Sequence, residues 1–231
     1  MLNGFGSEAE ARPWRALLEG RDVEVLATPA PMQDLGAYGY AAARLEDETV
    51  CLMNSYARPL RAGWLGLLAD ALAAPGVGAA AATGSWESHG TELRMRERWR
   101  LTPTVRGRLG GIYDWARYRV LFPRFPNPHL RTNGLICSRA LLADVLAEPP
   151  ADKPAAFVLE SGRRGVSRRA GGVVVVDIEG RVHRSDDWPA SRTFRSGEQE
   201  GLLIADNRTG DWMRASPDER TALYRRAWGA K

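Results

Sequence analysis

One stretch of this chain places polar side chains directly after an apolar run. The loop Asn54-Ser55-Tyr56 follows Val50–Met53, and Arg58 adds a cation two residues after the loop. Amide and hydroxyl oxygens can bind ligand hydroxyl groups, and the planar guanidinium of arginine suits bidentate contacts with phosphate. Mg²⁺ and Mn²⁺ prefer carboxylate oxygens, and this loop contains none. The loop therefore predicts binding of a polar ligand without a metal site.

A second polar stretch, Pro126–Asn133, precedes the apolar run around Ile136. Prolines at 126 and 128 restrict the backbone and would make this approach rigid. Four side chains here could hold a diphosphate or sugar hydroxyl groups: His129, Arg131, Thr132 and Asn133. The alternative is a structural turn in which Asn and Thr side chains cap their own backbone.

A single acid, Glu160, stands in the segment Phe157–Gly162, ahead of the apolar run Val173–Ile178. A carboxylate that reaches a hydroxyl group can remove its proton as a general base. The alternative is an acid near the start of a helix, where the helix dipole favours negative charge.

Helix and strand patterns alternate along the elements that must position these residues. Trp64, Leu68 and Leu72 repeat on one helical face, and Pro75-Gly76 should end that helix. Apolar runs at Val23–Thr28, Thr49–Met53, Val77–Ala82 and Val173–Ile178 predict strands. Such alternation predicts an α/β fold with a mostly parallel central sheet flanked by helices. Only Met1–Asn3 precede the first expected helix, so the first strand should be largely missing.

Helix caps can also be read in the second half of the chain. Ser138 should cap a helix that turns Leu141 and Leu142 inward. The sequence Ser216-Pro217-Asp218-Glu219 predicts a capping box with proline at the first helical position. These two signals fix the expected start of both helices.

The composition fits one domain without a membrane span. At 231 residues with 44% apolar residues, the chain can bury a sizeable core. No apolar run reaches the roughly 20 residues that span a bilayer, and no signal peptide is visible, so we expect a cytoplasmic protein. Cys51 and Cys137 each lie in an apolar run, which predicts two buried thiols without a disulfide.

Between Arg94 and Arg131 the chain carries ten arginines against only Glu97 and Asp114, with six aromatic residues among them. This basic-aromatic segment could contact a diphosphate, an anionic membrane surface or a nucleic acid. The alternative is a solvated helical face whose aromatic residues enter the core.

Three successive stretches resemble bacterial family-2 glycosyltransferases of the GT-A fold in their order and spacing. They are Val50–Leu60, Gly63-Trp64-Leu65 and Pro75–Trp86. The resemblance implies a single GT-A-like domain, with residues 1–90 as the nucleotide-binding half and 91–231 as the acceptor half. It also implies transfer of a hexose from a nucleoside diphosphate sugar to a surface glycan or lipid-linked acceptor. Contact with the inner face of the membrane would suit such an acceptor, whereas no nucleic-acid partner is expected.

The resemblance also assigns roles to residues. Glu160 would be the acceptor base, and Asp34, Asn54, Ser55 and Arg58 would lie on the nucleotide side. The diphosphate and sugar would meet His129, Arg131, Thr132 and Asn133, while Trp86 and Trp188 would contact the acceptor. The metal-binding Asp-x-Asp motif of the family is replaced by Asn54-Ser55-Tyr56, which points to transfer without Mg²⁺ or Mn²⁺.

Two alternative functions stay open, together with structural roles for Asp34 and Trp188. A non-catalytic glycan- or nucleotide-binding scaffold would keep the sheet and lose the chemistry. A nucleotidyltransferase would need metal-binding carboxylates and a glycine-rich phosphate loop, which the sequence does not show convincingly. For Asp34 and Trp188 the structural alternatives are a helix N-cap and a core residue.

Overall fold

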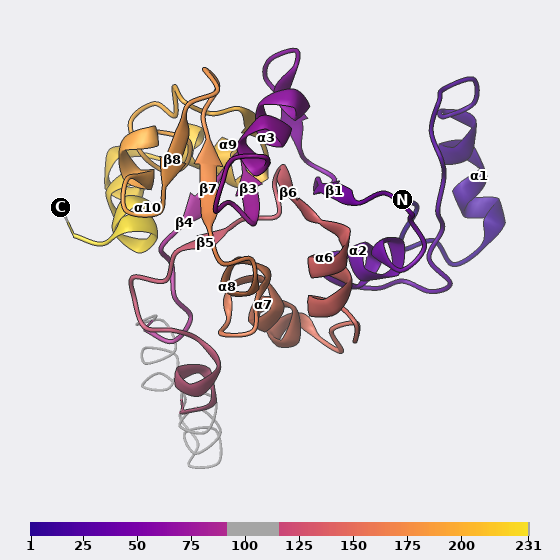
Figure 1. The fold of residues 1–231 in the computed structure, drawn as a ribbon, viewed down its shortest axis with the longest axis horizontal. Helices are drawn as coiled ribbons and strands as arrows, with labels where there is room; N and C mark the ends of the chain where they lie inside the picture. Colours follow the sequence, from indigo (N-terminus) through magenta and orange to yellow (C-terminus); the bar gives the residue numbers. More distant parts are fainter. Residues whose placement is uncertain (92–115, 231) are drawn as a thin grey trace.

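The computed structural model describes residues 1–91 and 116–230. Within them, a five-stranded sheet forms the centre of the molecule (Figure 1). In spatial order its strands are β1 (Thr49–Leu52), β6 (Leu135–Ser138), β3 (Ala79–Ala81), β7 (Val173–Val176) and β8 (Val182–Arg184). Two short pairs accompany it: β2 (Arg58–Pro59) with β9 (Ile204–Ala205), and β4 (Gly84–Ser85) with β5 (His129–Leu130). The fold is mixed α/β, as predicted.

The central sheet is mostly antiparallel, which corrects the expectation of a mostly parallel sheet. Of the described pairs, β3–β7 is parallel, whereas β1–β6, β3–β6 and β7–β8 are antiparallel. Strands β1, β3 and β7 share one direction, but the oppositely directed β6 lies between β1 and β3. The alternation along the first 85 residues could not reveal this, because β6 enters the sheet from the second half of the chain.

Side chains of the strands alternate between two hydrophobic cores. Ala79, Ala81 and Val175 belong to one core, whereas Ala80 and Val174 belong to the other. This two-residue period is the geometry of a strand buried on both faces. The small alanine side chains of β3 allow close approach of the layers on either side.

Helices cover both faces of the sheet. Helix α3 (Trp64–Leu72) packs on β3, β6 and β7, and its Leu68 is fully buried. The other core receives α2 (Asp34–Ala42), α6 (Arg139–Val145) and α8 (Val166–Arg169), with α7 (Lys153–Ser161) packed against α8. Further helices among the described residues are α1 (Glu8–Ala16), η1 (Trp188–Ser191), α9 (Asn207–Arg214) and α10 (Pro217–Trp228), and residues 116–121 are also helical.

The predicted helix caps are confirmed. The Ser138 hydroxyl accepts from the backbone N–H of Leu141 at the start of α6. Ser216 and Glu219 form the reciprocal capping box of α10, with Pro217 in its first turn. Gly76, after α3, has a φ of 78°, a left-handed conformation that glycine adopts without strain.

The start of the chain contributes little to the described sheets. Leu2 forms a single parallel bridge with Ala27, and the expected strand Val23–Thr28 extends no further than that bridge. Helix α1 lies at one end of the molecule and α10 near the other (Figure 1). Within the described chain, therefore, the opening strand is reduced to one bridge.

Both cysteines are free thiols, as predicted; Cys137 is fully buried, whereas Cys51 is only half-buried, which corrects the expectation of two buried thiols. None of the helices in the described part of the chain is both long and apolar enough to cross a membrane. Residues 94–115, which form most of the basic-aromatic segment, lie outside the described residues.

Candidate functional site

A cavity of about 490 Å³ lies where several strands end. Asn54 follows β1, and the neighbouring segment 131–134 leads into β6, so both meet at one edge of the sheet. Two backbone bonds join these ends: Gly134 N–H donates to the Leu52 carbonyl over 2.9 Å, and Arg131 N–H donates to the Thr83 carbonyl over 3.1 Å. The carboxyl ends of β1 and β3 are thereby held together, and such a position is a common binding site in α/β proteins.

Six of the predicted site residues line this cavity, although they come from four separate parts of the sequence: Asp34, Asn54, His129, Arg131, Thr132 and Glu160. A volume of this size is within the range of small-molecule sites. Most of the lining side chains are polar or charged. The cavity is therefore suited to a polar ligand.

Three other predicted polar residues do not line it. Ser55 is exposed in the loop, and Arg58 lies on β2 beside a smaller neighbouring cavity of about 370 Å³. Asn133 is only 1% exposed, and its Nδ2 donates to the Ile204 carbonyl over 2.9 Å. Asn133 therefore fixes the main chain near β9 instead of facing the cavity.

The two tryptophans assigned to an acceptor are structural. Trp188 is fully buried, and its indole N–H donates to the His183 carbonyl over 3.0 Å. Trp86 is half-buried, donates to the Ser185 carbonyl over 2.7 Å and packs edge-on against Trp228. Neither lines the cavity, so the core interpretation holds for Trp188, and Trp86 likewise packs against the core.

The Asn54 loop does not fit a divalent cation. The Asn54 Oδ1 already accepts the backbone N–H of Tyr56 over 2.9 Å, and the Ala57 N–H donates to the Asn54 carbonyl over 3.0 Å. These bonds make a self-capped turn. In the part of the chain that the structure describes, no group of three His, Cys, Asp or Glu side chains is placed to hold a metal ion. We therefore derive no step through a metal.

Glu160 lies in the last turn of α7, which corrects the expectation that it stands near a helix start. The carboxyl end of a helix disfavours negative charge, so the helix dipole does not explain this acid. Its carboxylate has no hydrogen-bond or ion-pair partner among the described residues. Buried Asn127 donates to the carbonyl of the next residue, Ser161, over 2.8 Å and so holds this end of α7 in place.

Asp34 is exposed in the first turn of α2, and the N-cap position belongs to Gln33. The N-cap alternative for Asp34 is therefore not what the structure shows. Its carboxylate is free to face the cavity that it lines.

His129 is a buried, neutral imidazole at the cavity. Its Nδ1 lies 2.9 Å from the Asn127 carbonyl, which can only accept, so Nδ1 carries the hydrogen. Burial lowers the pKa of His129 below its ordinary value. Near pH 7 the other nitrogen, Nε2, is therefore an acceptor that can take a hydrogen bond from a ligand hydroxyl group.

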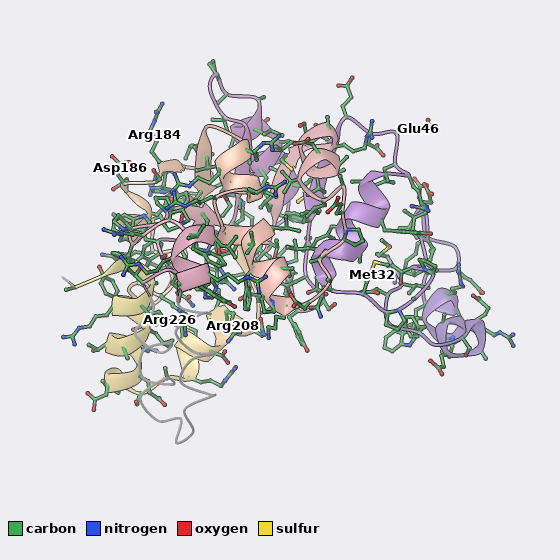
Figure 2. All side chains as sticks on the ribbon, turned by 90° about the horizontal axis from the view of Figure 1, so that it is seen from below. Met32, Glu46, Arg184, Asp186, Arg208 and Arg226 are labelled. Carbon is green, nitrogen blue, oxygen red and sulfur yellow. The ribbon has the colours of Figure 1, made fainter. Side chains whose placement is uncertain are left out.

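The cavity also contains residues that sequence reasoning missed. They include Glu87 and His89 after β4, Phe194 and Arg195 after η1, and Arg226 on α10. Figure 2 labels Arg208 and Arg226, which lie close together on the side of the molecule formed by α9 and α10. For these residues the sequence offered one local signal, the polar run Glu87-Ser88-His89 after Trp86, because the arginines come from distant helices and loops.

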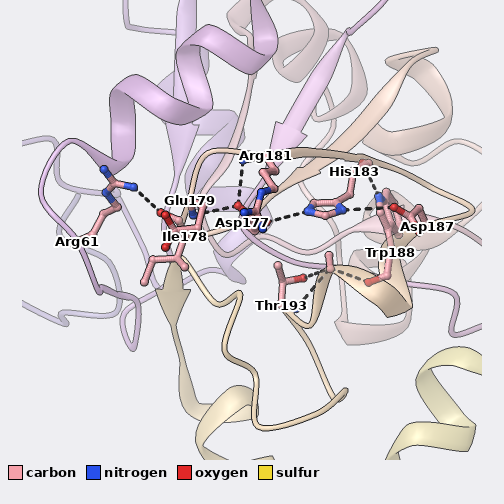
Figure 3. Close-up of polar contacts among 10 residues, drawn as sticks. Arg61, Asp177, Ile178, Glu179, Arg181, His183, Asp187, Trp188 and Thr193 are labelled. Carbon is pink, nitrogen blue, oxygen red and sulfur yellow. Dashed lines mark hydrogen bonds and ion pairs between the residues drawn. The ribbon is translucent and has the colours of Figure 1, made fainter.

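A second polar cluster lies outside the cavity, in the β7–β8 hairpin (Figure 3). Asp177 Oδ1 accepts the backbone N–H groups of Glu179 and Arg181, each over 2.9 Å. Its Oδ2 lies 2.9 Å from Nε2 of His183, whose Nδ1 is 3.5 Å from Asp187. The cluster binds the turn to the adjacent strand and is explained by that structural role.

Comparisons with protein-family models, with curated proteins and with solved structures find no significant match to this chain. A functional assignment therefore depends on the geometry and chemistry of the cavity itself.

Proposed function

We propose that the cavity binds a nucleoside diphosphate sugar and transfers the sugar to an acceptor hydroxyl group. One observation carries the proposal: the carboxylate of Glu160, unpaired within residues 1–91 and 116–230, shares a single cavity with the arginines Arg131, Arg195 and Arg226. Sugar transfer needs both groups, a base for the incoming hydroxyl and cations for the departing diphosphate.

Glu160 acts as the base in this mechanism. It takes the proton of the acceptor hydroxyl as the oxygen attacks the anomeric carbon and the bond to the diphosphate breaks. Its carboxylate is half-buried and has no competing hydrogen bond within the described chain, so it can accept that proton directly. His129 Nε2 can orient the same hydroxyl or one on the sugar.

The nucleotide side of the ligand lies toward Asp34 and Asn54. The Asp34 carboxylate can accept from ribose hydroxyl groups, and the Asn54 side-chain amide retains its N–H donors after its Oδ1 is used in the turn. Thr132, next to Arg131 in the sequence, adds a hydroxyl group to the cavity wall. The acceptor, a glycan or lipid-linked sugar, would enter from the Glu160 side.

Isothermal titration with UDP-, GDP- and dTDP-sugars, followed by a turnover assay with the one that binds, tests the proposal. Glu160→Gln should abolish turnover and change donor affinity less than about threefold, because a base contributes to the transition state. Glu148→Gln, which alters an exposed acid beyond α6, is the matched control. If none of the nucleotide sugars binds, with or without Mn²⁺, the proposal is wrong.

A non-catalytic nucleotide- or glycan-binding protein of the same fold is the second candidate. The self-capped Asn54 turn favours it, because the carboxylate motif expected of an active family member is absent. Binding of a nucleotide sugar without turnover by the wild type, for any acceptor offered, would select this candidate.

A further inference from the structure

Two guanidinium groups lie against one buried aromatic ring in the cavity. The Cζ of Arg131 is 4.2 Å from the centre of the Phe194 ring, and the Cζ of Arg195 is 4.8 Å from it. Phe194 is 1% exposed, so its ring is a fixed platform. Stacking on such a ring restricts the planes of both guanidinium groups.

Two carboxylates hold these arginines. Glu87 Oε1 lies 2.7 Å from Nη1 of Arg195 and 2.9 Å from Nε of Arg226. Asp206 Oδ2 lies 3.2 Å from Nη2 of Arg131, while its Oδ1 accepts the Thr209 N–H as the cap of α9. The contacts thus link three guanidinium groups to two carboxylates.

Donor groups remain unused at this position. Nη1 of Arg131 and Nε of Arg195 are buried and have no hydrogen-bond partner among the described residues. A buried donor without a partner is destabilising. Burial lowers the pKa of Arg195, and the guanidinium groups of Arg131 and Arg226 lower it further, against the opposing effect of Glu87. Two buried N–H donors of this group are thus unused within the described residues.

The backbone that carries Arg195 is also held in an unusual conformation. Arg195 has a φ of 46°, and Arg192 and Gln199 in the same loop have φ values of 53° and 54°. Left-handed backbone is unfavourable for a residue other than glycine. The Arg195 N–H donates to the Gln199 side chain over 3.2 Å, which stabilises the loop in this form. Strain of this kind is concentrated at binding sites.

We propose that Arg131 and Arg195 form a diphosphate-binding subsite that works without a divalent cation. Glu87 and Asp206 are its positioning residues. Each carboxylate contacts one nitrogen of its arginine and leaves other N–H groups of that arginine for the ligand. Phosphate oxygens would accept hydrogen bonds from the unused N–H groups and lie next to the two guanidinium groups. The assignment to a diphosphate rests on the proposed function, since that group would leave from the nucleotide sugar.

Titration of inorganic pyrophosphate in the presence of EDTA tests the subsite by itself. Pyrophosphate should bind the wild-type protein, and affinity should fall at least tenfold in Arg131→Gln and in Arg195→Gln, about the effect of one charge-assisted hydrogen bond. Affinity should also decrease with rising salt. Arg184→Gln is the matched control: it removes the same charge from an exposed position on β8, away from Arg226 (Figure 2).

Arg131→Lys and Arg195→Lys guard against loss of folding, because they keep the charge and remove the fork. Weaker binding by these folded variants, checked by circular dichroism, supports the subsite. Absence of pyrophosphate binding in EDTA, or equal affinity in all variants, overturns it. Pyrophosphate binding that depends on both arginines, without turnover of any nucleotide sugar, would retain the subsite and reject the transferase. Nucleotide-sugar turnover that is unchanged in both variants would retain the transferase and reject the subsite.

Discussion

Glu87 Oε1 lies 2.7 Å from Nη1 of Arg195, although 108 residues separate them in the sequence. The same oxygen contacts Arg226 on α10. One carboxylate therefore connects the loop after β4, the loop after η1 and the last described helix.

Glu87→Gln should destabilise the protein. The amide keeps an acceptor but removes the negative charge that contacts the guanidinium groups of Arg195 and Arg226, and we expect a loss of about 2 kcal/mol in the free energy of unfolding. Urea denaturation monitored by circular dichroism measures it. Glu148→Gln should change stability by less than about 0.5 kcal/mol, as exposed substitutions usually do. Equal stability of the two variants would show that the pairing contributes little.

The effect of Glu87 should depend on pH. Burial raises the pKa of this carboxyl, but the guanidinium groups of Arg195 and Arg226 outweigh burial and hold it below the ordinary value of 4.5. The unfolded chain therefore binds the proton more readily, so the stabilisation is complete above about pH 4.5 and is lost as the pH falls through the lower folded pKa. The stability difference between wild type and Glu87→Gln should shrink on acidification; a constant difference from pH 7 to pH 3 would contradict this.

His129 should be neutral and protonated on Nδ1 at pH 7. Nitrogen-15 NMR of the imidazole rings, assigned with a His129→Gln variant, would identify the tautomer. Because burial lowers the folded pKa of His129 below the unfolded value, protonation favours unfolding, and stability should decrease as the pH falls below about 6.5. The variant should lose less stability than the wild type between pH 7 and pH 5.5. A ring that is charged at pH 7 would refute the assignment.

A pair of substitutions can separate the two structural roles of Asp177, which are binding the backbone of the turn and contacting His183. Asp177→Asn keeps an oxygen for the N–H groups of Glu179 and Arg181 and weakens only the contact with His183. Asp177→Ala removes all three contacts. We expect losses of about 1 and about 3 kcal/mol in unfolding free energy, respectively. Equal losses would place the stabilisation in the His183 contact alone.

The two thiols should react slowly in the folded protein. Burial raises the pKa of Cys51 to about 12 and that of Cys137 to about 11, and the thiolate is the reactive form. Iodoacetamide at pH 8 should therefore label both residues readily in urea and only slowly without it, which mass spectrometry can follow. Rapid labelling of native Cys137 would indicate that β6 is accessible.

Local signals predicted much of the secondary structure. Ser138 and Ser216 cap helices, and Leu68 lies on the buried face of α3, because capping and amphipathic period depend on residues within a few positions. The order and direction of the strands could not be predicted from such local signals. The insertion of β6 between β1 and β3 depends on contacts between segments more than 50 residues apart, which no local pattern records.

By itself the sequence determined that a polar loop after β1, a polar approach to β6 and a lone acid at Glu160 are the places to look for a site. Only the tertiary structure decided that Asn54, Arg131 and Glu160 share one cavity while Asn133 and Trp188 are structural. It alone brought Glu87 to Arg195. Residue type sets what a side chain can bind, but distance and burial decide whether it does, and both arise from packing between distant segments.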